Sequence, residues 1–155
     1  MSTEDVRTQS DTVRAFDEST LVLGIETSCD ETAASVVEWR DGAPRVRSNA
    51  VSTQHDLHAR YSGVVPELAS RAHLDFIVPA VREALREAGC AATDVHAVAV
   101  GNRPGLIGSL LVGNAAAKAY AWSLGVPVIG LGTRAFPRFI SPGDDSLGVS
   151  AFASN

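Results

Sequence analysis

Cysteine is scarce in this sequence, and its scarcity limits the kinds of protein that the chain can be. Only Cys29 and Cys90 occur among 155 residues, so disulfides do not organise the fold and a reducing cytoplasm is the expected compartment. No apolar run reaches the roughly 18 residues of a membrane-spanning helix, and we expect no membrane partner. Basic residues are also outnumbered, with 13 Lys and Arg against 18 Asp and Glu and a formal net charge of −5. That balance argues against a broadly basic domain that binds nucleic acid by itself.

The chain divides into three parts by composition and pattern. Residues 1–20 are polar and lack periodicity, and we expect them to form a flexible tail. Residues 21–130 carry regular apolar patterns, and the chain as a whole, at 45% hydrophobic and 20% charged, has the composition of a globular protein. Residues 131–155 follow neither a helical nor a strand period, so no element is predicted there.

The apolar pattern of residues 21–130 switches between the strand period and the helix period. It predicts three strands, a helix, a strand, a helix and a fifth strand, at residues 21–25, 33–37, 46–52, 66–88, 96–100, 106–124 and 125–129. The order β-β-β-α-β-α-β indicates an α/β architecture with an antiparallel start and parallel strands after it. Pro79 lies inside the first helix and should kink or split it, because proline removes a backbone donor.

The second predicted helix, residues 106–124, is apolar on almost every side. A helix of this kind is usually buried in a larger body, so this one should be covered by a second lobe or by a partner. Left uncovered, it would expose a patch large enough to promote aggregation. We therefore expect the isolated chain to be poorly soluble or oligomeric.

A polar turn follows the first strand and contains candidate site residues. Thr27 and Ser28 offer hydroxyl groups and backbone N–H groups that suit an anionic ligand. Asp30 and Glu31 add two carboxylates that could orient a metal or accept a proton, and we place them near a reactive centre. The alternative is an ordinary hairpin with solvated acids.

A glycine-rich loop opens the second helix. Gly105 and Gly108 allow close backbone approach, and a helix N-terminus attracts anions, so this loop is a second candidate ligand site. It lacks the Gly-Lys-Ser/Thr ending of a phosphate-binding P-loop. Close packing between the strand and the helix would explain the glycines equally well.

Three histidines and two cysteines could also carry chemistry. His55 and His58 are separated by two residues in a polar loop, with His73 further along, and their spacing matches no helical metal-binding pair. We interpret them as loop and surface histidines held by hydrogen bonds. Cys29 and Cys90 have no activating histidine in the sequence pattern, and we interpret both as small packing residues.

Three ordered segments of about ten residues, 23–32, 63–71 and 104–113, resemble successive signatures of one enzyme family. It is the tRNA N6-adenosine threonylcarbamoyltransferase family, once known as the glycoprotease or O-sialoglycoprotein endopeptidase family. The resemblance runs over residues 21–130 and implies the N-terminal lobe of an actin-like ATPase fold, built from ribonuclease-H-like lobes. By that resemblance the chain is truncated after the fifth strand.

The resemblance also implies an activity and its partners. The family transfers a threonylcarbamoyl group from threonylcarbamoyl-adenylate to N6 of adenosine 37 in tRNAs that read codons beginning with A. It works with a dimerising paralogue of the same fold and with a small P-loop ATPase. Its metal, iron or zinc, is held by a His-x-x-x-His motif just after the fifth strand and by a downstream aspartate.

This sequence departs from the family where the metal ligands should be. Thr133 and Pro137 occupy the two histidine positions, and no histidine follows His96. Neither side chain is a usual ligand for iron or zinc, so no metal is expected in this chain. The loss of similarity and of patterning near residue 130 suggests a frameshifted or truncated copy of the enzyme. A divergent short paralogue would look the same.

Three functions remain open on the sequence. The first is an inactive N-terminal fragment of the transferase. The second is a metal-free paralogue that serves as a dimerisation scaffold, with partner contacts on the helix that starts at Pro66. The third, a sugar-kinase-like member of the same superfamily, is the least supported, because the three motifs point to the transferase.

Overall fold

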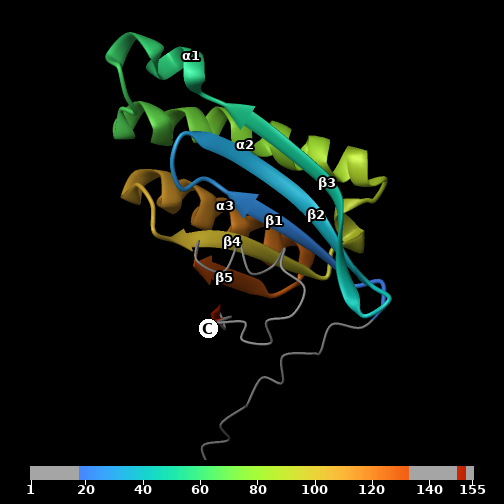
Figure 1. Ribbon diagram of the computed structural model, residues 1–155. Coiled ribbons are helices and arrows are strands. Elements are labelled where there is room, and N and C mark those ends of the chain that lie inside the picture. Colours follow the sequence, from blue (N-terminus) through green and yellow to red (C-terminus); the bar gives the residue numbers. More distant parts are fainter. Residues whose placement is uncertain (1–17, 133–149, 153–155) are drawn as a thin grey trace, which may run out of the picture.

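A computed structural model describes residues 18–132 and 150–152 of the chain. One mixed sheet, in the strand order β3-β2-β1-β4-β5-β6, forms a layer, and the long helices α2 and α3 pack side by side against one of its faces (Figure 1). The main elements in chain order are β1 (Leu21–Glu26), β2 (Glu31–Arg40), β3 (Ala43–Thr53), α1 (His55–His58), α2 (Pro66–Ala88), β4 (Ala97–Arg103), α3 (Ile107–Leu124), β5 (Val128–Gly132) and β6 (Ser150–Phe152). The predicted α/β class and the order of its first seven long elements are confirmed.

The first three strands form an antiparallel meander, and the next two strands run parallel to β1. Asp41 and Gly42, at φ 54° and 72°, make the tight turn between β2 and β3. Positive φ at both central residues matches the right-handed twist of the flanking strands. β1 then pairs in parallel with β4, and β4 with β5. As a result, the carboxyl ends of β1 and β4 lie next to each other at one edge of the sheet.

The hydrophobic core lies between the sheet and the two helices. Leu23 and Ile25 of β1 are about 1% exposed and point toward the helices, as the strand alternation predicts. Val81 of α2 and Val98 of β4 close the same core. Burial of each such side chain contributes roughly 1.5–3 kcal/mol, so these contacts fix the position of α2 over the meander.

Pro79 does not split α2, which is one helix of 23 residues. Ile77 and Ala80 on either side of it are buried and hold both halves of the helix on the sheet. Pro79 itself is exposed, so water can reach the backbone carbonyl of Asp75 that loses its partner. The two ends of α2 are as the sequence predicts. Pro66 lies in the first turn, and Gly89, at φ 64°, ends the helix.

Two segments contain structure that the sequence pattern did not predict. The polar stretch after β3 forms the short helix α1 and a 3-10 turn at Ala59–Tyr61. Within residues 131–155, Ser150–Phe152 forms strand β6, antiparallel to β5. The expectation that no element follows the fifth strand is therefore wrong at these three residues, because pairing with an available strand edge, and not local periodicity, makes them a strand. Of the flexible tail predicted over residues 1–20, residues 1–17 lie outside the described residues, as do Thr133 and Pro137. Ser19 and Thr20 are described, and their backbone groups bond to those of Trp39, so the prediction of a free tail is wrong at these two residues.

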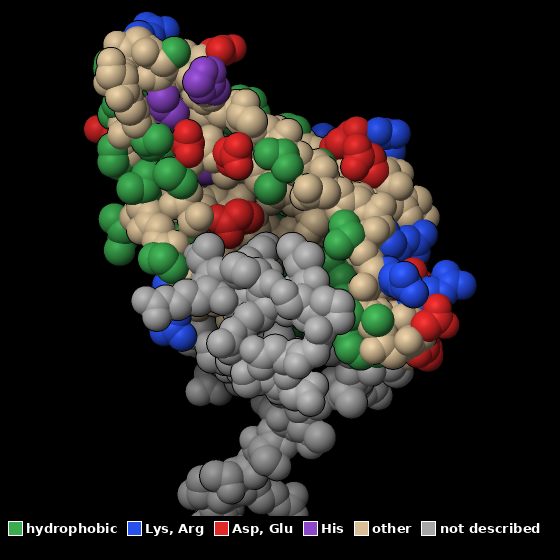
Figure 2. All heavy atoms as spheres, viewed as in Figure 1, with side chains coloured by type: hydrophobic (Ala, Val, Ile, Leu, Met, Phe, Trp, Pro, Cys, Tyr) green, Lys and Arg blue, Asp and Glu red, His purple; other side chains and the backbone are tan. Residues whose placement is uncertain are grey.

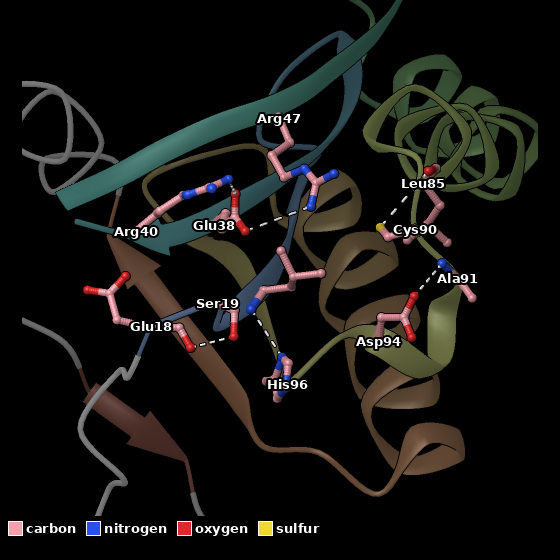
Figure 3. Close-up of polar contacts among 11 residues, drawn as sticks. Glu18, Ser19, Glu38, Arg40, Arg47, Leu85, Cys90, Ala91, Asp94 and His96 are labelled. Carbon is pink, nitrogen blue, oxygen red and sulfur yellow. Dashed lines mark hydrogen bonds and ion pairs between the residues drawn. The ribbon is translucent and has the colours of Figure 1, made fainter. Parts of the chain in front are cut away.

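Polar contacts join neighbouring elements at the end of the sheet where β1 begins. The Leu21 N–H donates to His96 Nδ1 at 3.1 Å, which holds the residue before β4 beside the start of β1 (Figure 3). Glu38 lies 3.9 Å from Arg40 of its own strand, β2, and 3.9 Å from Arg47 across the β2–β3 hairpin. These contacts are at the opposite end of β1 from its carboxyl end, where the candidate site lies. Among the described residues, no helix has the length and apolar character needed to cross a membrane.

Candidate functional site

A small pocket lies at the carboxyl end of β1, where the chain turns into β2. Its lining residues are Glu26, Ser28, Cys29, Asp30 and Glu31. Figure 2 shows acidic side chains grouped on this face, below the histidines of α1. Three of the five lining residues are acids, so the pocket is suited to bind hydrogen-bond donors or to accept a proton from one.

The pocket turn is joined to the start of α3. The Leu106 N–H donates to the Ser28 carbonyl at 2.8 Å. A Cβ added at Gly105 would lie 2.7 Å from the Ser28 carbonyl oxygen and 2.9 Å from its Cβ, so only glycine fits there without a backbone shift. The structure thus brings together Ser28 and Gly105, two predicted site residues that are 77 positions apart in the sequence.

Two other predicted ligand-binding residues face helices and do not line the pocket. Thr27 is fully buried, and its hydroxyl donates to the Ser109 carbonyl at 2.8 Å. Gly108 faces α2, where an added Cβ would lie 3.0 Å from Ser70 Oγ. Both residues therefore contribute to the close packing of helix on turn and of helix on helix.

Asp30 and Glu31, which the sequence analysis placed near a reactive centre, both line the pocket, and Asp30 changes the pKa of its neighbour Cys29. A hydrogen bond to the Asp30 side chain, together with burial and the negative charges of Asp30 and Glu31, raises the pKa of the Cys29 thiol. Cys29 is exposed. The interpretation of Cys29 as a packing residue is therefore wrong: the turn directs its side chain toward solvent, and its backbone carbonyl instead faces the helices. Cys90 is half-buried beside the core, as expected.

Glu26 is a pocket residue that the sequence analysis did not select. Its Oε1 accepts a hydrogen bond from the Ser28 N–H at 2.5 Å. Its Oε2 is buried and has no hydrogen-bond partner among the described residues. An added Cβ at Gly101 of β4 would collide with that oxygen, so the space for the carboxylate depends on a glycine in the neighbouring strand. The sequence does show that an acid, Glu26, ends a buried strand. It does not show which way that side chain points.

His73 is the second residue whose environment the sequence did not reveal. It is fully buried in α2, with its ring between Thr32, Gln54 and the Cys29 carbonyl. His58 is also buried and bonds to Gln54, whereas His55 is exposed. Hydrogen bonding is thus confirmed for His58, but the interpretation of His58 and His73 as surface residues is wrong, because both rings are buried against neighbouring elements.

The described residues do not form a site for the iron or zinc that the resemblance implies. Within residues 18–132 and 150–152, no group of three or more His, Cys, Asp and Glu side chains is placed to hold a metal ion. The positions where the resemblance puts the histidine ligands are Thr133 and Pro137. A threonine hydroxyl is not a usual ligand for iron or zinc, and proline has no side-chain donor.

The fold and the position of the pocket define a class. A mixed sheet with an antiparallel meander, two helices on one face and a site at the carboxyl ends of β1 and β4 is a ribonuclease-H-like lobe of the actin-like ATPase type. The structure of YeaZ from Pseudomonas aeruginosa shares this fold with a TM-score of 0.55, at 22% identity, over 76% of this chain and 49% of that chain. The family model TsaD, tRNA N6-adenosine threonylcarbamoyltransferase, matches residues 45–135, more than half of the sequence. The chain belongs to this family.

Curated relatives carry the same name. A tRNA N6-adenosine threonylcarbamoyltransferase of Symbiobacterium thermophilum is 57% identical over 111 residues, which are 72% of this chain and 32% of the relative. The Salinibacter ruber protein of that name is 60% identical over 111 residues, with the same shares. The chain thus spans about a third of the length of these relatives.

Proposed function

We propose that this chain supplies the N-terminal lobe of a tRNA N6-adenosine threonylcarbamoyltransferase and acts in the cytoplasm. The complete enzyme would transfer threonylcarbamoyl from threonylcarbamoyl-adenylate to N6 of adenosine 37 in tRNAs that read codons beginning with A. The observation that carries the proposal is the meeting of two motif segments at one acidic pocket, where the Leu106 N–H binds the Ser28 carbonyl. Family membership supports the same reaction.

The pocket offers the chemistry that the transfer requires. The adenosine N6 attacks the carbamoyl carbon, the bond from that carbon to the phosphate oxygen breaks, and the nucleotide leaves as the monophosphate. A proton must leave N6 in the process. Asp30 and Glu31 present carboxylates that can accept it. Glu26 Oε2, which has no partner among the described residues, can accept a hydrogen bond from an N–H or O–H of the ligand.

We further propose that the chain alone does not catalyse the transfer. Its residues at the family's ligand positions, Thr133 and Pro137, have the wrong chemistry for iron or zinc. It also spans about a third of its relatives' length. The purified 155-residue chain should therefore contain no stoichiometric iron or zinc by elemental analysis and should leave tRNA unmodified.

A chimaera tests the function of the lobe. Residues 21–130 would replace the matching lobe of the Symbiobacterium thermophilum relative, and adenosine 37 of tRNA would be analysed by mass spectrometry after reaction. We expect modified adenosine, and loss of it when Asp30→Asn and Glu31→Gln are combined. Glu83→Gln on the outer side of α2, whose partner is Arg86, is the matched control and should keep activity. An inactive but folded chimaera, or an active double variant, would contradict the proposal.

A scaffold function is the second candidate, and one observation favours it. Large apolar side chains are exposed on both helices: Leu74 and Val78 on α2, and Ile107, Leu111 and Trp122 on α3. Ser70 and Gly108 lie in contact, so the first turns of the two helices are adjacent. The partners proposed for this face are the dimerising paralogue of the same fold and, through that complex, the small P-loop ATPase.

The scaffold proposal has a simple binding test. The chain and the paralogue would be mixed and their complex measured by analytical ultracentrifugation. Leu111→Glu should abolish the complex, because it puts a charge into the apolar face. Val46→Glu, at an equally exposed position of β3, should leave it intact. Equal binding by both variants would exclude this face as the interface.

A further inference from the structure

Three buried side chains form a continuous chain of hydrogen bonds that ends at the pocket turn. The Val65 N–H lies 3.3 Å from His58 Nδ1, and His58 Nε2 lies 3.2 Å from Gln54 Oε1. Gln54 Nε2 lies 3.3 Å from His73 Nδ1. His73 Nε2 then lies 3.1 Å from the carbonyl oxygen of Cys29. This series of hydrogen bonds runs from Val65, the residue before α2, to the backbone carbonyl of Cys29 in the pocket turn.

The fixed donors and acceptors at its two ends determine the direction of every bond. The Cys29 carbonyl can only accept, so His73 carries its proton on Nε2, and its neutral Nδ1 accepts from the Gln54 amide. The Thr32 hydroxyl, 2.8 Å away, donates to the same nitrogen. The Val65 N–H can only donate, so His58 accepts on Nδ1 and donates from Nε2 to Gln54 Oε1. One orientation of the Gln54 amide satisfies both histidines.

Burial favours the neutral form of the His73 ring. His73 and Thr32 are fully buried, and Gln54 and His58 are 3% and 5% exposed. Burial lowers the pKa of His73, while its bond to the Cys29 carbonyl and the charges of Glu26 and Asp30 act in the opposite direction. A protonated His73 would also point a second N–H at the donating amide of Gln54. The arrangement therefore requires a neutral ring.

The last acceptor in this series of hydrogen bonds is the carbonyl of Cys29, a residue of the pocket turn. Cys29 stands between Ser28 and Asp30, and all three residues line the pocket. The Cys29 carbonyl receives a second donor, Ser109 Oγ of α3, at 3.3 Å. The Cys29 carbonyl therefore accepts hydrogen bonds from His73 of α2 and Ser109 of α3. Because these bonds hold the backbone of the turn toward the helices, the side chains of Cys29 and Asp30 line the pocket.

We propose that His73 is a positioning residue, which with Gln54 and His58 holds the Cys29 carbonyl so that Asp30 and Glu31 face the bound ligand. The role in ligand binding rests on the function proposed above, but the positioning itself is a property of this chain. His73 touches no pocket space, since Cys29 separates it from the pocket. Its effect on chemistry is exerted only through the backbone of the turn.

The tautomers can be read directly from the full 155-residue chain. Two-dimensional ¹⁵N–¹H spectra of the imidazole rings at neutral pH should show His73 as a neutral Nε2–H tautomer and His58 with a proton on Nε2. The exposed ring of His55 has none of these hydrogen bonds and serves as the internal control. An Nδ1–H tautomer or a charged ring at His73 would overturn the proposal. This measurement needs no variant, so it does not depend on a mutant that folds.

The Cys29 thiol reports the position of the turn, because it is exposed in the pocket. In a Cys90→Ser background, His73→Asn cannot reach the carbonyl, so the turn can shift and the exposed thiol can lose the contact with Asp30 that raises its pKa. The labelling rate of Cys29 should then rise about fivefold or more. His73→Gln places an amide N–H near the Nε2 position and should restore the rate to within about twofold. Thr32→Val removes another partner of His73 but not the bond to Cys29, and should behave like the parent.

The labelling rates and the activity of the chimaera distinguish a positioning role of His73 from a general effect on stability. They also distinguish that role from the proposed transferase function. Equal labelling of His73→Asn and parent would overturn the positioning role, and so would equal acceleration by Thr32→Val, which would indicate general destabilisation. If the tautomers and rates are as expected but the chimaera leaves tRNA unmodified, the proposed function fails and the positioning of the turn stands. If the chimaera is active, His73→Asn in it should lower kcat more than His73→Gln does.

Discussion

The Leu106 N–H and the Ser28 carbonyl are joined by a hydrogen bond of 2.8 Å, which connects the residue before α3 to the turn after β1. The bond satisfies one of the backbone groups that a turn would otherwise leave to solvent. It also sets the distance between the two motif segments, so a change in either one displaces the other. The first two predictions test this coupling.

Gly105→Ala should destabilise the chain by about 1–3 kcal/mol, since overpacking against backbone atoms forces the chain to shift. The added Cβ would meet the Ser28 carbonyl at 2.7 Å. Urea denaturation followed by circular dichroism measures the change. Gly63→Ala is the matched control, because nothing lies within 4 Å of its Cβ position, and it should be close to neutral. Equal effects of the two substitutions would contradict the close approach.

Thr27→Val should cost about 1 kcal/mol, the usual net contribution of a buried neutral hydrogen bond. The Thr27 hydroxyl is fully buried and donates to the Ser109 carbonyl, and valine keeps the shape but not the donor. Thermal or urea unfolding would measure it, with Thr53→Val at an exposed position of β3 as the control. A stabilising effect at Thr27 would show that the hydroxyl is not needed there.

Asp30→Asn should lower the pKa of the Cys29 thiol relative to the parent. The Asp30 carboxylate is the main cause of the raised pKa, first by its hydrogen bond and then by its charge. Without it, more thiolate is present at a given pH, and iodoacetamide should alkylate Cys29 severalfold faster near neutrality. The pH dependence of alkylation in a Cys90→Ser background gives the pKa. Asp75→Asn, exposed on α2, should leave the curve in place.

The free energy of unfolding should fall as the pH drops through the ordinary histidine range. Burial lowers the pKa of His73 in the folded chain, so the unfolded chain takes up the proton first. Its contribution is therefore complete above the unfolded value of about 6.5 and is lost as the pH falls toward the folded value. Urea titrations over this range should show a weaker dependence in His73→Gln. An unchanged dependence would mean that His73 titrates alike in both states.

The isolated chain should self-associate through the apolar face of α2 and α3. Ile107 and Trp122 are 89% and 87% exposed, and Leu111 is 69% exposed on the same helix. Exposed apolar patches of this kind promote association. Sedimentation velocity should show oligomers that Leu111→Glu dissociates and Val46→Glu does not. A monomeric parent with a sharp two-state melt would contradict the prediction.

The candidate site could be predicted in part, because some of its residues are local to one motif. Asp30 and Glu31 follow a buried strand directly, and the pocket contains both. Thr27 belongs to the same motif, yet its side chain turns into α3, because the strand alternation gives it the inward face. Glu26 and His73 could not be selected, since their environments are created by Gly101 and Cys29 on distant parts of the chain.

The sequence by itself determined the class of fold and the order of the long elements, because apolar spacing and local stop signals such as Gly89 act over a few residues. Only the tertiary structure decided that α2 continues through Pro79, that Ser150–Phe152 pairs with β5, and that a histidine predicted as a loop or surface residue is the most buried of the four. Those outcomes depend on packing, strand pairing and the solvation of backbone groups, which join residues far apart in the chain. Local propensity carries no information about such partners.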